Sequence, residues 1–118
     1  MDRDIKERTF NFGLRIINVS QHLPNTKAGD VLGKQVLRSG TSVGANVEEA
    51  TAACSTNDFT YKMNIALKEA RETHYWLRLL AGSQVVEQKQ LSDVIEEADE
   101  IKKVLGSIVS KMRGRSKG

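Results

Sequence analysis

The stretch RSGTSVGANVEEA, residues 38–50, contains several residues that helices disfavour, although the sequence around it is typical of helices. Gly40 and Gly44 lie four residues apart in this stretch, and each glycine costs a helix about 1 kcal/mol relative to alanine. The segment is therefore either a loop that holds chemistry or a helix whose small residues let another element come very close.

The flanking sequence favours the helix. Starting from a cap at Thr26, a three-and-four spacing connects the residues expected to face inward, which are Leu32, Val36, Ser39, Val43, Asn46, Ala50 and Ala53. Because residues four apart share one face of a helix, Gly40 and Gly44 would together open a place where another helix can pack. The spacing thus predicts one helix over residues 27–53.

Polar residues inside such a helix need hydrogen-bond partners. Thr41 and Ser42 can donate their hydroxyls to carbonyl groups one turn earlier. Ser39 and Asn46 are predicted to be core polar residues, and a buried amide without partners is costly. We therefore expect Asn46 to form hydrogen bonds across the bundle and to help fix the register of the helices.

The same periodicity recurs along the chain. It predicts helices at about 4–23, 27–53, 56–81 and 88–112, the third capped by Ser55, followed by a basic tail at 113–118. In the first helix Phe10 and Ile17 are expected to flank the inward stripe on the same broad face. Because short loops join long helices, we predict an all-α protein, a single domain with an antiparallel up-down-up-down four-helix bundle.

Composition excludes several classes of protein. With 118 residues the chain fits one domain, and no apolar stretch is long enough to span a membrane. The net charge of +3 comes from the C-terminus, because the last eight residues hold four basic residues and no acidic one. The single cysteine, Cys54, and the charged start without a secretory signal lead us to expect a cytoplasmic protein.

Residues 38–50, together with residues 57–77, closely resemble the small bacterial four-helix bundle proteins encoded within intervening sequences of 23S rRNA genes. The typical pattern runs through Arg-Ser, Thr-Ser-Val, Ala-Asn, Asp-Phe, Ile-Ala and Trp-Leu. The residues that match it here are Arg38, Ser39, Thr41, Ser42, Val43, Ala45, Asn46, Glu49, Asp58, Phe59, Ile65, Ala66, Glu69, Glu72, Trp76 and Leu77.

The resemblance implies a fold and an assembly more firmly than an activity. Members of this family resemble one another in forming ring-like homopentamers. A related bundle, the accessory variability determinant of diversity-generating retroelements, binds a reverse transcriptase and RNA. We therefore expect a homo-oligomer, with RNA or a reverse transcriptase as possible partners.

The third helix carries a second apolar stripe, which supports assembly independently of the resemblance. A helix in a four-helix bundle needs one apolar stripe, and exposed aromatic patches tend to mark interfaces. The residues of the predicted oligomer interface are Tyr61, Ile65, Trp76 and Leu79. The alternative is that Trp76 folds over the edge of the bundle and Tyr61 extends its hydroxyl into water.

Enzymatic interpretations find little support in the sequence. His22 and His74 are the two histidines, and neither has an acidic residue at the spacing of a helical metal site. Glu48 and Glu49 are expected to be solvated or paired with a basic residue, and Cys54 is expected to be a buried, inert thiol. We expect no catalytic residue, cofactor, metal or small-molecule substrate.

Two functional hypotheses remain. The first is a non-catalytic oligomeric scaffold or interaction protein. The second is a nucleic-acid-binding accessory protein, in which a ring of subunits repeats a basic surface that attracts RNA phosphates. The candidate nucleic-acid-binding residues are Lys34, Arg38, Lys62, Lys68, Arg71 and Arg78.

Overall fold

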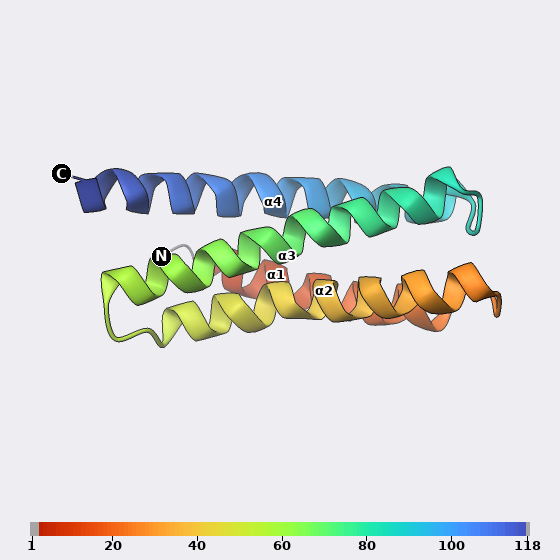
Figure 1. Ribbon diagram of the computed structural model, residues 1–118, viewed down its shortest axis with the longest axis horizontal. Coiled ribbons are helices and arrows are strands. Elements are labelled where there is room, and N and C mark those ends of the chain that lie inside the picture. The colour runs from red at the N-terminus through yellow and green to blue at the C-terminus, as the bar shows by residue number, and fades with distance from the viewer. Residues whose placement is uncertain (1–2, 118) are drawn as a thin grey trace.

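The computed structural model describes residues 3–117, which form four α-helices. Figure 1 shows them running along the long axis of the molecule, with the last turns of α4 and the α2–α3 loop at the same end. The helices are α1 (Arg3–Gln21), α2 (Lys27–Thr51), α3 (Thr56–Gly82) and α4 (Gln88–Lys117). The expected all-α, up-down-up-down bundle is confirmed.

The helix boundaries follow from local side-chain chemistry. Thr26 caps α2 by accepting a hydrogen bond from the backbone N–H of Gly29 at 3.0 Å, and Ser55 caps α3 through the N–H of Asp58 at 3.0 Å. Both caps match the sequence prediction, because a hydroxyl at the N-cap satisfies a backbone donor that has no helical partner. The first helix, α1, ends at Gln21, two residues before the predicted end at residue 23.

The C-terminus differs from the prediction. Instead of ending near residue 112 in a frayed basic tail, α4 continues through Lys117. Gly114 does not interrupt it, because a single glycine costs a helix only about 1 kcal/mol. Residue 118 and the side chains of Arg115 and Lys117, which belong to the predicted tail, lie outside the described part of the structure.

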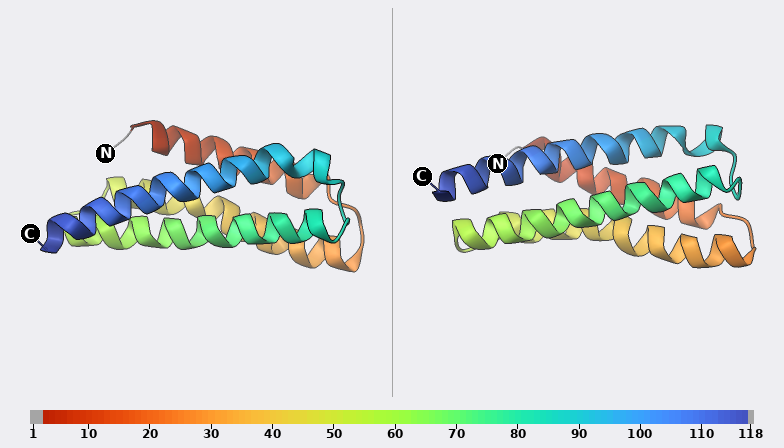
Figure 2. Two further views of the ribbon diagram at one scale, coloured as in Figure 1. Left: turned by 90° about the horizontal axis from the view of Figure 1, so that it is seen from above. Right: turned by 45° about the horizontal axis from the view of Figure 1, so that its top comes forward.

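The hydrophobic core lies between the four helices. Large, fully buried side chains come from each helix, including Phe12, Val43, Met63, Leu77 and Leu105. Figure 2 shows the helices side by side in two further views. Among them, α2 and α3 are in the most extensive contact, whereas α1 and α4 are in the least.

A charged cluster joins α1 and α4, the pair of adjacent helices with the least contact. Arg8 donates from Nε to Glu97 Oε2 at 2.9 Å and from Nη2 to Glu97 Oε1 at 2.8 Å, and it also binds Glu100. The hydrogen bonds from Arg8 lower the pKa of the Glu97 carboxyl. The paired geometry of the Arg8–Glu97 bond adds direction as well as energy to the link between these two helices.

Within residues 3–117, none of the helices is both long and apolar enough to cross a membrane.

Candidate functional site

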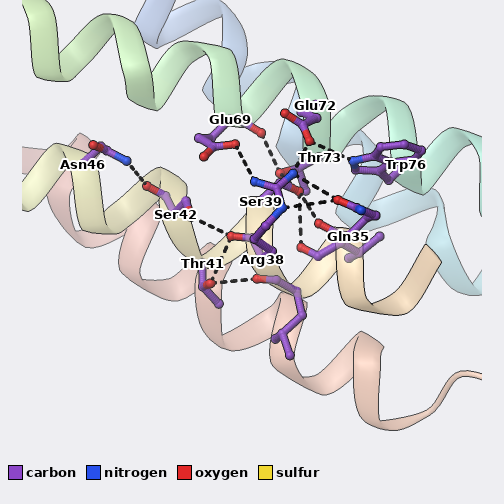
Figure 3. A network of polar contacts seen from close by, with 12 residues as sticks. Gln35, Arg38, Ser39, Thr41, Ser42, Asn46, Glu69, Glu72, Thr73 and Trp76 are labelled. Carbon is purple, nitrogen blue, oxygen red and sulfur yellow. Dashed lines mark hydrogen bonds and ion pairs between the residues drawn. The ribbon is translucent and has the colours of Figure 1, made fainter. Parts of the chain in front are cut away.

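Residues 38–50 form the middle of α2 and are helical throughout, so the loop interpretation is wrong. The inner face of this segment carries one buried polar pair (Figure 3). Ser39 is completely buried and donates its hydroxyl to the carbonyl of Gln35 at 2.8 Å. Thr73 on α3, also completely buried, lies with Oγ1 at 2.9 Å from Ser39 Oγ and 2.7 Å from the carbonyl of Glu69.

Asn46 does not occupy the position that the sequence spacing predicts. It is only half-buried, and its amide donates to the carbonyl of Ser42 at 2.8 Å, one turn earlier in α2. The prediction of a bond across the bundle is wrong because Val47, completely buried, takes the inward place. The inward spacing runs from Ser39 through Val43 to Val47, so Asn46 lies at the flank.

The hydroxyls of the stretch behave as predicted. Thr41 Oγ1 donates to the carbonyl of Leu37 at 2.7 Å, and Ser42 Oγ donates to the carbonyl of Arg38 at 2.6 Å. Both bonds return to the preceding turn of the same helix, as Figure 3 shows. Both hydroxyls therefore find acceptors in the backbone of α2 itself.

Arg38 links α2 to α3. Its guanidinium binds the carboxylates of Glu69, at 3.4 Å, and Glu72, and it also donates to Gln35 Oε1 at 3.1 Å. Trp76 donates from its indole Nε1 to Glu72 at 3.3 Å, which extends the network along α3. Because two carboxylates of α3 bind it, the Arg38 guanidinium acts as a link between α2 and α3.

Gly40 and Gly44 of α2 lie where α1 packs against this helix. A Cβ atom added at Gly40 would lie 2.7 Å from both Cγ1 and Cγ2 of Ile16, and one added at Gly44 would lie 3.1 Å from the carbonyl oxygen of Thr9. Real Cβ atoms do not tolerate the first distance, so the absence of a side chain at Gly40 is required for α1 to pack at its observed depth. The predicted close approach at these glycines is confirmed.

An apolar groove runs outside this contact, between α1 and α2. It has a volume of about 330 Å³. Its apolar walls come from exposed side chains of α1, of which Phe10 is 61% exposed, with Leu14 and Ile17 beside it. We call this surface the α1/α2 groove; its remaining lining residues are Lys6, Thr9, Gly13, Thr41, Gly44, Ala45 and Glu48.

The groove corrects the prediction for α1. Phe10 and Ile17 were expected to flank the inward stripe, yet both face outward. The buried residues of α1 are Ile5, Thr9, Phe12 and Ile16, and Phe10 lies about 160° around the helix from Phe12. The helix thus has two apolar faces, and sequence periodicity did not separate them.

The second stripe of α3 is divided between the core and the surface. Tyr61 and Leu79 are exposed, whereas Ile65 and Trp76 are half-buried, and Trp76 packs against the core. The place of Trp76 is compatible with either alternative, so the predicted interface stays a prediction.

Tyr75 is an exposed aromatic that the sequence prediction missed. It is 49% exposed, and its ring meets that of Trp76 edge to face, with centroids 5.2 Å apart. The available signal was the spacing of Tyr61, Lys68 and Tyr75, which are seven residues apart and therefore share the outer face of α3. We call Tyr61, Lys68, Tyr75 and Leu79 the tyrosine face.

The six basic candidates do not converge on one surface. Lys34 and Arg38 lie on α2, and Arg38 is held by Glu69 and Glu72. Lys62, seven residues before Glu69, lies on the side of α3 that faces α2. Lys68 points outward with the tyrosine face. Arg78 lines a cleft between α3 and α4, and Arg71, seven residues before it, lies on the same side.

The cleft between α3 and α4 brings His74 near Asp99. The distance from His74 Nε2 to Asp99 Oδ1 is 3.9 Å, too long for a hydrogen bond. Burial, followed by the positive charge of Lys102, lowers the pKa of His74, whereas hydrogen bonds from Lys103 and Lys102 lower the pKa of Asp99 to about 2. The imidazole is therefore largely neutral at pH 7.

The other residues considered for chemistry lie elsewhere. His22 lines a separate cleft with Val86 and Gln90, and Glu48 pairs with Lys6 at 3.3 Å. Cys54 is exposed, which corrects the prediction of a buried thiol: it lies in the α2–α3 loop, past the end of the core stripe. Within residues 3–117, no three His, Cys, Asp or Glu side chains are grouped closely enough to hold a metal ion.

The chain is similar to known proteins in sequence and in structure. The sequence profile of the 23S rRNA-intervening sequence protein family matches residues 1–107. A crystal structure of a protein with unknown function from the S23 ribosomal protein family of Bacteroides thetaiotaomicron matches with a TM-score of 0.83 and 45% sequence identity, covering 89% of this chain and 97% of that chain. No match was found among curated proteins.

The matched range contains all of α1, α2 and α3 and most of α4, and thus both the glycine contact and the Ser39–Thr73 pair. The chain therefore belongs to the 23S rRNA-intervening sequence protein family.

Proposed function

We propose that this protein is a non-catalytic scaffold that assembles with copies of itself, as a homopentamer in the cytoplasm. The observation that carries the proposal is the pair of apolar surfaces left uncovered on one small bundle. The α1/α2 groove exposes Phe10, Leu14 and Ile17, and the tyrosine face exposes two aromatic rings and Leu79. Exposed apolar surfaces of this kind, edged by charged residues, mark protein interfaces.

The polar chemistry of the molecule supports a structural role. The buried hydroxyls of Ser39 and Thr73 bind each other and backbone carbonyls, and Arg38 is held by two carboxylates. Each of these groups joins α2 to α3, which are the elements that must stay rigid if an assembly is to use their outer surfaces.

The mass of the native particle tests this proposal. One chain has a mass of 13.1 kDa, and size-exclusion chromatography with light scattering should give a particle of about five chains at micromolar concentration. A particle with another fixed number of chains would agree with the scaffold proposal and would overturn the pentamer. A monomer over the whole concentration range would overturn both.

A second candidate function is RNA binding as an accessory protein of a reverse transcriptase, as in the related retroelement bundles. The observation that favours it is that Lys68, Arg71 and Arg78 are exposed and form no ion pair with any residue in the described part of the chain. A ring would repeat these charges around its circumference. Opposing this, Arg38 is already neutralised by Glu69 and Glu72.

Salt dependence separates the two functions. If RNA is the partner, a gel shift with structured RNA should show binding at about 50 mM salt that is lost by about 200 mM, because each neutralised phosphate releases counterions. The double variant Arg71→Glu, Arg78→Glu should abolish this binding and leave the particle mass unchanged. Binding that survives the double variant, or no binding at any salt concentration, would overturn this candidate.

A further inference from the structure

We propose that the tyrosine face of one copy packs into the α1/α2 groove of the next copy, so that the subunits join head to tail. This inference rests on the proposed assembly and names the two surfaces that form it. The occupant of the groove is therefore a second copy of this chain, contributed through the outer face of its α3.

The two surfaces lie on different sides of the molecule. The groove lies between α1 and α2, whereas the tyrosine face lies on α3, which contacts α2 and α4. A contact between two different surfaces of identical subunits is heterologous. A row of subunits joined in this way keeps one uncovered groove and one uncovered tyrosine face at its two ends until a ring closes. A single patch that paired with itself would instead stop at a dimer and leave the other apolar surface bare.

The heights of the two surfaces along the bundle agree. Ser39 lies opposite Thr73 on α3, and Gly40 lies opposite Ile16 on α1, so these positions of α1 and α3 are at about the same height. Tyr75 is half a turn beyond Thr73 and is therefore close in height to Ile17. Rotation about an axis parallel to the helices preserves height, so it brings Tyr75 of one copy opposite the groove of the next.

Charge adds to this match. Gly44 lies opposite Thr9, and Lys68, five residues before Thr73, therefore lies near the height of Phe10. Lys68 is exposed and forms no ion pair within the described chain, and the same holds for Glu7, which lines the cleft beside Phe10. The proposed contact would bring these unpaired opposite charges close together at its rim, where charge pairs favour the correct orientation.

The chemistry of the tyrosine face suits such a contact. A tyrosine ring buries a large apolar area with few rotatable bonds, and its hydroxyl can stay at a wet rim. The lining of the groove is mostly apolar and includes Lys6 and Glu48, which pair with each other. Leucine side chains would lack a hydroxyl that can stay in contact with water at the rim.

A pair of complementary variants tests the inference. Leu14→Arg disables the groove and keeps the tyrosine face, whereas Tyr75→Arg does the opposite. Each variant alone should be monomeric by light scattering, with unchanged helicity by circular dichroism, because both side chains are about half exposed in the isolated chain. When the two are mixed at high concentration, one intact groove meets one intact tyrosine face, and a particle of two chains should form and grow no further.

Val31→Arg is the matched control. Val31 is an exposed aliphatic residue on α2, 55% exposed, that does not line the groove. The variant should keep the mass of the wild-type particle. If Tyr75→Arg also keeps that mass, or if the mixture of Leu14→Arg and Tyr75→Arg remains monomeric, the head-to-tail contact is overturned while the scaffold stands. A monomeric wild-type protein would overturn the scaffold itself.

A charge reversal gives a second, milder test. Lys68→Glu should raise the dissociation constant of the assembly about tenfold, and adding Glu7→Lys in the same chain should restore it, because each contact then has its opposite charges exchanged. Sedimentation velocity over a dilution series measures both values. Equal dissociation constants for the single and the double variant would overturn the proposed pairing of these two surfaces.

Discussion

At the scale of single residues, the buried hydroxyl pair explains how polar side chains fit in the centre of the bundle. Ser39 and Thr73 each have an acceptor in their own helix, the carbonyls of Gln35 and Glu69, in addition to each other. A buried polar group that loses one partner is costly only when no other partner remains. The pair should therefore tolerate the loss of either member.

Thr73→Val should lower the free energy of unfolding by about 1 kcal/mol, because Ser39 keeps its bond to Gln35. Ser39→Ala should cost a similar amount, since Thr73 can still donate to Glu69. Urea denaturation of both single variants and the double variant measures the coupling between them. A loss above about 3 kcal/mol for either single variant would mean that the remaining hydroxyl is left unsatisfied.

The residue scale also shows where sequence reasoning was wrong. The spacing rule allows steps of three or four, so it permits either Asn46 or Val47 after Val43. The structure buries Val47, because placing an apolar side chain in the core avoids the cost of burying an amide. Ser39 was placed correctly because its hydroxyl can bond to its own backbone, whereas the orientation of Asn46 depends on packing that one sequence does not contain.

At the scale of helices, the glycines of α2 set how closely α1 can approach. Three atoms of Ile16, which is completely buried, lie within 3.1 Å of the position that a Cβ at Gly40 would take. A branched side chain in a filled core has little room to move aside. Sequence reasoning found this contact because the two glycines share a face, although it did not identify α1 as the partner.

Gly40→Ala should destabilise the protein by about 1–3 kcal/mol through overpacking, despite the better helix propensity of alanine. Gly106→Ala in α4 is the matched control, because a Cβ there meets no atom within 4 Å. The control should stabilise the protein by up to about 1 kcal/mol. Thermal melts of both variants measure the difference, and stabilisation by Gly40→Ala would show that α1 does not press on this site.

The link between α1 and α4 should make stability depend on pH. The pKa of Glu97 is lowered in the fold, so its bond with Arg8 stabilises the protein above the unfolded value of 4.5 and is lost as pH falls through the folded value. Glu97→Gln should cost about 1–2 kcal/mol at pH 7 and should flatten the loss of stability below pH 4.5.

Glu100→Gln is the control for this prediction. Glu100 also binds Arg8, but its side chain is 53% exposed, so the change should cost less than the change at Glu97. Urea denaturation at a series of pH values measures both variants. An unchanged slope in Glu97→Gln between pH 3 and pH 5 would show that the Arg8–Glu97 bond does not carry this dependence.

At the scale of the whole molecule, the order of the helices could be read from periodicity, but the surfaces that remain exposed could not. Both α1 and α3 carry apolar residues on two sides, and a periodic pattern does not say which side faces the core. Phe10 and Ile17 were therefore placed inward, and Tyr75 was missed. Only the packing of α1 against the α2 glycines shows that Phe10, Leu14 and Ile17 face outward.

The central claim is that another copy of the chain covers the α1/α2 groove, and thiol accessibility at Leu14 tests it most directly. In a Cys54→Ser background, Leu14→Cys should react slowly with a maleimide in the native particle, whereas Val31→Cys should react quickly. Adding Tyr75→Arg should release the first thiol without affecting the second. Equal and fast reaction of both thiols in the native particle would contradict the claim, because the groove would then be open to water.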